Sequence, residues 1–174
     1  MSVQAGGLEF VVRPVQPADT PRVAEHFLSV ADEPLFVLTT AFPRTLEQTK
    51  QFLEQVRATP HVNLLIAVQG SRCIGHCLVR STDHAALRHV AKISMAVSSD
   101  FRRGGVGKSL LEEAEKWARL HKIHKITLDV LANNRPALRL YEKMRYREEG
   151  ARKDQVIIDG RFDDELMLAK FLEH

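Results

Sequence analysis

The stretch 97–108 constrains the fold of this chain most, because it joins an apolar, strand-like run to a long amphipathic helical pattern. Three glycines and three cations fall within residues 102–108. Glycine lets the backbone turn tightly and approach a ligand closely, and the first N–H groups of a helix have no partner inside the helix. A helix that begins here therefore directs free donors at an anion, and we expect a phosphate.

Two common phosphate-binding motifs fit this stretch poorly. A P-loop, G-x-x-x-x-G-K-[ST], matches at 107–109, but its first glycine position holds Arg102, whose side chain would fill the space around a phosphate. A dinucleotide-binding motif, G-x-G-x-x-G, matches at 105–107 but has Leu110 at its third glycine. A nucleotide-binding protein is the alternative that these partial matches leave, and a rise in melting temperature with ATP would support it.

A third pattern, Q/R-x-x-G-x-G/A, fits in full at Arg102, Gly105 and Gly107. About thirty residues later, 134–143 reads N-R-P-A-L-R-L-Y-E-K. With both motifs in place the chain resembles the GNAT superfamily of N-acetyltransferases, which use acetyl-CoA, and the likeness covers roughly residues 8–171. It departs at 145–146, where the family usually has Gly-Phe and this chain has Arg-Tyr. A left-handed helix end is common there, and arginine adopts it only at some cost.

The resemblance implies a coenzyme site and a catalytic residue. Tyr141 would be the general acid that protonates the departing thiolate, although its spacing alone also fits a core tyrosine. The backbone of 103–108 would hold the pyrophosphate, and the strand at 94–97 would pair with the pantetheine arm and offer an N–H to the oxyanion. Asn134 would bind the pantetheine or cap its helix. The implied coenzyme-binding residues are Met95, Ala96, Val97, Arg102, Arg103, Gly104, Gly105, Val106, Gly107, Lys108 and Asn134.

Hydrophobic periodicity predicts one mixed α/β domain over residues 8–171, with a flexible N-terminus at 1–7 and a tag-like end at 172–174. The expected order is β-α-α-β-β-β-α-β-α-β-β, with about seven strands in a mostly antiparallel sheet and helices on both faces. Asp19 and Thr45 are the expected caps of the first two helices. We expect strands at 8–13, 63–68, 73–80, 89–97, 125–131, 146–151, 155–158 and 165–171, and helices at 19–30, 45–58, 106–121 and 136–144.

The acceptor amine must lose a proton before it attacks, since the pKa of a free alkyl amine is about 10. The sequence offers four candidate bases without choosing among them. Acceptor specificity is expected from 32–43, the second helix and the last hairpin. The acidic run at 159–165 is either a solvated turn or a surface that attracts a cationic acceptor. The candidate bases are Glu33, His76, Asp83 and His84.

We therefore expect an acetyl-CoA-dependent N-acetyltransferase that acts on a primary amine by direct attack in a ternary complex, because no cysteine lies near the motif to carry the acetyl group. A small molecule or amino acid is the preferred acceptor, and a protein N-terminus is a second one. The alternative function is a non-catalytic acyl-CoA-binding or sensing module on the same fold. A homodimer is a reasonable expectation for the family.

Composition limits the partners. The net charge is only +3 and no long basic block occurs, which argues against nucleic acid. No apolar run approaches the roughly 20 residues that span a membrane. Cys73 and Cys77 would lie on one face of a strand about 13 Å apart, too far for a disulfide. Reduced thiols favour a cytoplasmic protein, and no metal-binding motif is present.

Overall fold

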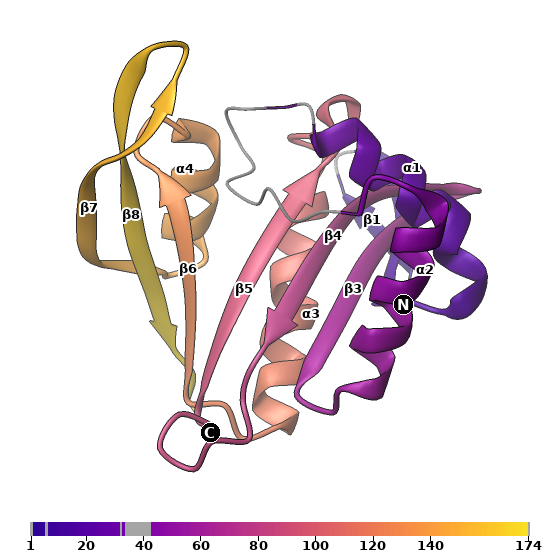
Figure 1. Ribbon diagram of the computed structural model, residues 1–174, viewed down its shortest axis with the longest axis horizontal. Coiled ribbons are helices and arrows are strands. Elements are labelled where there is room, and N and C mark those ends of the chain that lie inside the picture. The colour runs from indigo at the N-terminus through magenta and orange to yellow at the C-terminus, as the bar shows by residue number, and fades with distance from the viewer. Residues whose placement is uncertain (1, 6, 32, 34–42, 174) are drawn as a thin grey trace.

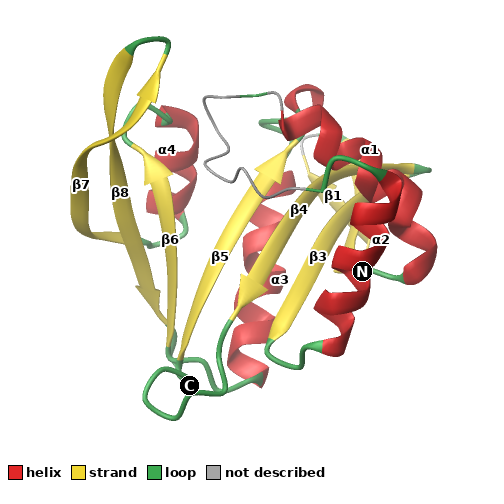
Figure 2. Ribbon diagram, viewed as in Figure 1, coloured by secondary structure: helices red, strands yellow, loops and turns green. Residues whose placement is uncertain are grey.

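The computed structural model describes residues 2–5, 7–31, 33 and 43–173. Within them, one eight-stranded sheet has helices on both faces (Figures 1 and 2). The strand order is β1-β2-β3-β4-β5-β6-β8-β7, and only β5 and β6 pair in parallel, which confirms the mixed, mostly antiparallel sheet. The strands are β1 (Ser2–Ala5), β2 (Leu8–Pro14), β3 (Val62–Gln69), β4 (Arg72–Arg80), β5 (Val90–Val97), β6 (Lys125–Leu131), β7 (Arg147–Ile158) and β8 (Arg161–Phe171).

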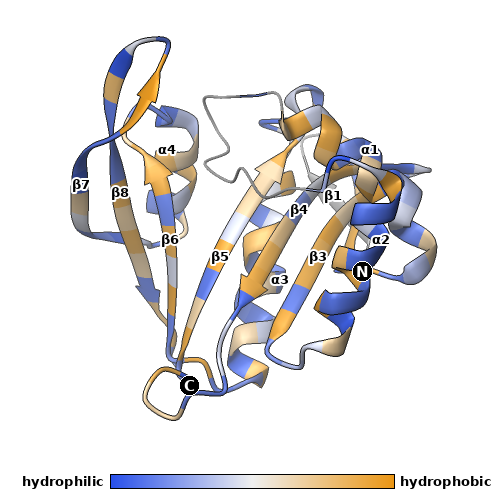
Figure 3. Ribbon diagram, viewed as in Figure 1, coloured by the Kyte–Doolittle hydropathy of each residue, from blue (hydrophilic) through white to orange (hydrophobic). Residues whose placement is uncertain are grey.

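The helices pack on both faces of the sheet and form an apolar cluster on each. They are α1 (Thr20–Ala31), α2 (Leu46–Ala58), α3 (Val106–Leu120) and α4 (Arg135–Lys143), with short 3-10 turns η1 (Pro17–Asp19) and η2 (Ser99–Phe101). One apolar cluster packs α3 and α4 against one face, and a second packs α1 and α2 against the other (Figure 3). On α2, Leu53 and Val56 are buried, whereas Leu46 is 57% exposed. No helix in the described part of the chain is long and apolar enough to cross a membrane.

Both ends of the chain make backbone hydrogen bonds to neighbouring segments. β1 lies in the segment predicted to be flexible and pairs antiparallel with β2. The sequence of β1 does not predict a strand, and the backbone of β2 supplies its hydrogen-bond partners. Leu172, expected to lie outside the fold, is 2% exposed, and its N–H donates to the carbonyl of His124 at 2.8 Å. The two strands expected at 146–151 and 155–158 form one strand, β7, with a register shift between Arg152 and Val156.

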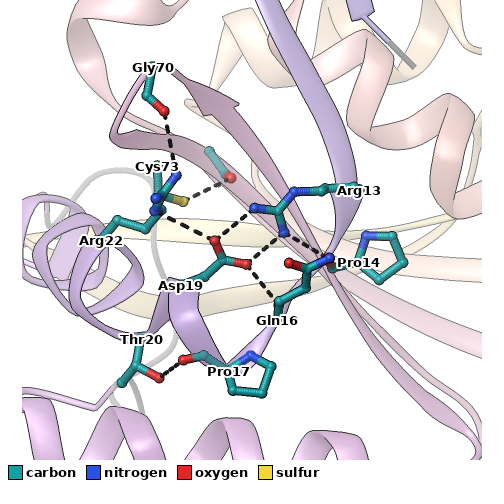
Figure 4. Close-up of polar contacts among 10 residues, drawn as sticks. Arg13, Pro14, Gln16, Pro17, Asp19, Thr20, Arg22, Gly70 and Cys73 are labelled. Atoms are coloured by element: carbon teal, nitrogen blue, oxygen red, sulfur yellow. Dashed lines mark hydrogen bonds and ion pairs between the residues drawn. The ribbon is translucent and has the colours of Figure 1, made fainter.

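The start of α1 is held by an ion pair rather than by the predicted cap (Figure 4). Asp19 ends η1 and is buried, and its carboxylate accepts hydrogen bonds from Arg13 at 2.6 and 2.8 Å and from the Gln16 N–H at 2.8 Å. The hydrogen bond from Arg13 lowers the pKa of Asp19. Asp19 therefore ties β2 to α1. The predicted cap of α2 is confirmed, since the Thr45 hydroxyl accepts from the Gln48 N–H.

An extra residue in β4 reverses the alternation of its side chains. Gly75 pairs with Ala67 and Cys73 pairs with Val68, so Ile74 is inserted as a β-bulge. Cys73 consequently packs on the α1–α2 face and Cys77 on the α3 face. The prediction that the two thiols share a face is wrong for this reason. Both are free and buried, and burial raises the pKa of each to about 12.

Candidate active site

The parallel strands β5 and β6 pair over a short distance and then diverge (Figure 1). Their paired residues run only from Val90–Lys125 to Lys92–Thr127. Beyond this point β5 continues along β4, and β6 continues along β8. Within the described residues, the edge of β5 that faces β6 at 93–97 therefore has no strand partner. Unpaired backbone groups need hydrogen-bond partners, and an extended ligand with amide groups can add to such an edge as a strand would.

A row of free backbone donors lies just beyond the unpaired end of β5. Arg103 and Gly105 have left-handed backbones, with φ of 65° and 82°, which turn the chain into α3. The first helical bond runs from the Ser109 N–H to the Gly105 carbonyl, and no side chain caps α3. The N–H groups of 103–108 donate to no acceptor among the described residues. Together with the positive end of α3, this array suits a phosphate.

Arg102 braces this turn with its side chain. Its Nε donates to the Val97 carbonyl at 3.0 Å, its guanidinium pairs with Glu33, and its backbone N–H donates to Ser99 at 3.2 Å. These contacts join the end of β5 and the residues after α1 to the turn. The cations left to face solvent in the turn are Arg103 and Lys108, and the Lys108 ammonium lies 3.6 Å from Glu112.

Gly107 is the point where α3, β5 and α4 approach one another. A Cβ at this position would lie 2.9 Å from Cδ2 of Leu140 and 3.5 Å from Cε of Met95. Glycine is therefore needed for packing as well as for access to the backbone. The contact brings α4 against the divergent ends of β5 and α3, so the two sequence motifs meet in space.

Tyr141 follows Leu140 on α4 and is 6% exposed. Its ring meets that of Tyr146 edge-on at 5.7 Å, and it packs in the same buried cluster as Cys77. Burial raises the pKa of Tyr141 above its ordinary value of 10.0, so the phenol keeps its proton at neutral pH. A phenol that keeps its proton at neutral pH has a proton to donate, as a general acid must.

The ends of α4 agree with the sequence. Asn134 is buried, and its Oδ1 accepts from the Ala137 N–H at 3.2 Å, so it caps the helix as one of its two expected roles. Arg145 adopts the left-handed conformation, with φ of 67°. The N–H groups of Arg145 and Tyr146 donate back to Glu142 and Tyr141, both at 2.9 Å, which is the hydrogen-bond pattern of a Schellman helix end.

The candidate bases separate in space. Asp83 and His84 are exposed in the connection before β5, at the end opposite the donor turn. Glu33 is half-buried and pairs with Arg102. His76 is fully buried on β4 and forms a hydrogen bond with His26, a residue that the sequence did not single out.

Of the three regions expected to choose the acceptor, the segment 32–43 falls mostly outside the described residues. Residues 32 and 34–42 of the predicted segment lie outside the described residues. In the acidic run, Asp164 pairs with Lys153 at 2.7 Å and Glu165 with Arg152 at 2.5 Å. Cations of β7 therefore offset much of the negative charge that the sequence suggested. No group of three or more His, Cys, Asp or Glu in the described chain could hold a metal ion.

Comparisons with known proteins agree with this geometry. The model of the acetyltransferase (GNAT) family matches residues 20–146. An L-amino acid N-acetyltransferase of Escherichia coli is 26% identical over 121 residues, which cover 67% of this chain and 73% of the relative. A ribosomal-protein-alanine N-acetyltransferase from Brucella melitensis superposes with a TM-score of 0.82 at 25% identity, covering 93% of this chain and 99% of its own. A phosphinothricin acetyltransferase from Sinorhizobium meliloti, in complex with acetyl-CoA, gives a TM-score of 0.82 at 16% identity, with coverages of 94% and 88%.

Proposed function

Because the chain belongs to the GNAT family of acetyltransferases, we propose that it transfers an acetyl group from acetyl-CoA to the primary amine of an amino acid or another small molecule. The E. coli relative is an L-amino acid N-acetyltransferase, which supports this class of acceptor. The amine of a protein N-terminus is the second candidate, since a structural neighbour acts on a ribosomal protein.

One observation carries the proposal: a row of N–H donors at 103–108, free among the described residues, follows the unpaired strand edge at 93–97 after the short turn η2. Coenzyme A joins a pyrophosphate, which needs N–H donors, to an arm with amide groups, which can pair with a free strand edge. We assign the pyrophosphate to the backbone of 103–108 and the arm to Met95, Ala96 and Val97, with Asn134 nearby on α4. When bound, acetyl-CoA supplies the acetyl group as an activated thioester.

We assign the general-acid role to Tyr141. Its raised pKa keeps a proton on Oη at neutral pH, and that proton would neutralise a leaving thiolate. The acceptor amine must be neutral before it attacks, and direct transfer needs no covalent acetyl-enzyme. Cys77 packs in the same buried cluster as Tyr141, and burial holds its thiol protonated by raising its pKa to about 12, which makes it a poor nucleophile.

A thiol-release assay with acetyl-CoA and a panel of amines tests the proposal. The panel contains L-amino acids, polyamines and short peptides with free N-termini, and calorimetry measures acetyl-CoA binding in parallel. We expect turnover with at least one L-amino acid. A protein that binds acetyl-CoA but releases no thiol with any amine would instead be a sensing module, and failure to bind acetyl-CoA would exclude both functions.

Tyr141→Phe tests the assigned acid. Turnover is expected to fall by about 100-fold or more, since a positioned acid contributes about that much, while the affinity for acetyl-CoA is unchanged. Tyr146→Phe is the matched control, because it removes a hydroxyl from the neighbouring ring. Equal turnover in wild type and Tyr141→Phe would show that Tyr141 is a core residue only.

A further inference from the structure

A chain of three hydrogen-bonded side chains, two of them buried, lies on the α1 face of the sheet and ends at Ser98, between β5 and the N–H donors of 103–108. His76 on β4 contacts His26 on α1, with 2.8 Å between His76 Nδ1 and His26 Nε2. The other ring nitrogen of His26, Nδ1, lies 2.9 Å from the hydroxyl of Ser98, the residue after β5. His26 is 2% exposed and His76 is 0% exposed. None of these side chains has a part in the proposed chemistry.

The two hydrogen bonds of His26 depend on each other. Burial lowers the pKa of His26 to about 4 and that of His76 well below its ordinary value, so both rings are neutral at neutral pH. A neutral imidazole has one N–H and one bare nitrogen. If His26 donates to His76, it must accept from Ser98, and if it donates to Ser98, it must accept from His76. The three side chains therefore act as one unit.

Ser98 is fixed at three of its atoms. Its N–H donates to the Ile74 carbonyl at 3.0 Å, its carbonyl accepts from the Phe101 N–H at 3.0 Å, and its hydroxyl bonds to His26. These contacts hold it to β4, to η2 and to α1 at once. Ser98 is also where β5 ends and the path to 103–108 begins, so its orientation sets the direction in which those N–H groups point.

A second connection runs beside the first. Glu33, just after α1, pairs with Arg102, and Arg102 in turn bonds to the Val97 carbonyl. Helix α1 thus contacts Ser98 through His26, and Glu33 contacts Arg102 on the far side of Ser98 from β5. An anion site built from backbone donors is effective only if the donors are already aimed, because ordering them on binding costs affinity.

We propose that His26, His76 and Ser98 are positioning residues that hold the coenzyme turn in its binding conformation. The inference rests on the proposed function, because it concerns the affinity of the same turn for coenzyme A. It assigns these side chains to coenzyme binding and not to the chemical step.

Calorimetry with coenzyme A and steady-state kinetics test this role. Ser98→Ala is expected to weaken coenzyme A binding about tenfold and to raise KM for acetyl-CoA similarly, because the turn loses its preset direction. The turnover number at saturating acetyl-CoA and KM for the amine should stay within about twofold. Ser98→Thr keeps a hydroxyl and should restore most of the affinity. Ser29→Ala is the matched control, since that hydroxyl donates only to the backbone carbonyl of His26.

A double-substitution cycle tests whether the chain acts as a unit. His76→Leu should weaken coenzyme A binding in the wild-type background but have no further effect beside Ser98→Ala, because the hydrogen-bonded path from His76 to the turn passes through His26 and Ser98. Thermal melting shows whether each variant is folded. If His76→Leu does not fold, the affinity of Ser98→Ala for coenzyme A alone tests the positioning role.

The outcomes separate the two proposals. If wild type does not bind coenzyme A, the proposed function fails and this role fails with it. If wild type binds and folded Ser98→Ala binds equally well, or if the effects of Ser98→Ala and His76→Leu simply add, the positioning role alone is overturned. A fall in the turnover number without a change in coenzyme affinity would overturn it too, since that result places the chain in the chemical step.

Discussion

Replacing Arg145 by glycine should stabilise the protein, because Arg145 ends α4 in a conformation that suits glycine better. Its φ is 67°, and the N–H groups of Arg145 and Tyr146 make the two closing hydrogen bonds of the helix end. The Arg145 side chain is exposed. The substitution therefore removes strain without removing a buried contact or a backbone hydrogen bond.

Two opposing effects set the magnitude. A residue with a Cβ in the left-handed region costs about 1–2 kcal/mol. Glycine has more conformational freedom in the unfolded chain, and this offsets about 0.5–1 kcal/mol of the stabilisation. The net gain in the free energy of unfolding is then about 0.5–1 kcal/mol, and a gain of 1 kcal/mol raises Tm by about 2–4 °C in a domain of this size.

Urea unfolding followed by circular dichroism measures the gain, with Arg145→Ala as the control. Alanine removes the guanidinium but keeps the Cβ, so its free energy of unfolding should stay within about 0.5 kcal/mol of wild type. The reasoning is refuted if glycine and alanine give equal stability, because the strain would then not come from the Cβ. The substitution keeps the hydrogen bonds at the end of α4, so Tyr141 on this helix should keep its position. Turnover of Arg145→Gly should therefore equal that of wild type.

Two further predictions concern buried polar groups. Tyr146→Phe should raise the free energy of unfolding by about 1 kcal/mol, because the buried Tyr146 hydroxyl has no hydrogen-bond partner among the described residues; an unchanged or lower Tm would mean that the hydroxyl is bonded in solution. The free energy of unfolding should also fall as the pH drops from about 6.5 toward 4, since burial lowers the pKa of His26 from 6.5 to about 4 and the unfolded chain then binds more protons. Urea titrations across this range should show a smaller pH slope for His26→Gln, and an equal slope would assign the effect to other groups.

Local signals in the sequence predicted most of the elements. The amphipathic period of α3, the glycine turn before it and the Thr45 cap of α2 each depend on residues within a few positions of one another. The cost of Arg145 at the end of α4 was readable for the same reason. Asp19 shows the limit of this reasoning, because its carboxylate pairs with Arg13, six residues earlier on β2, instead of acting as the predicted cap.

The sequence by itself determined the family resemblance, the donor-rich turn and the helix that carries Tyr141, because short-range backbone preferences and motif spacing encode them. Only the tertiary structure decided how these parts meet. The bulge at Ile74 moved Cys73 to the opposite face from Cys77, and β5 and β6 diverge after three paired residues each. Likewise, residues 72 positions apart join where His26 meets Ser98 at the edge of the coenzyme turn. Such contacts follow from the packing of whole elements against one another, and no local pattern of residues records them.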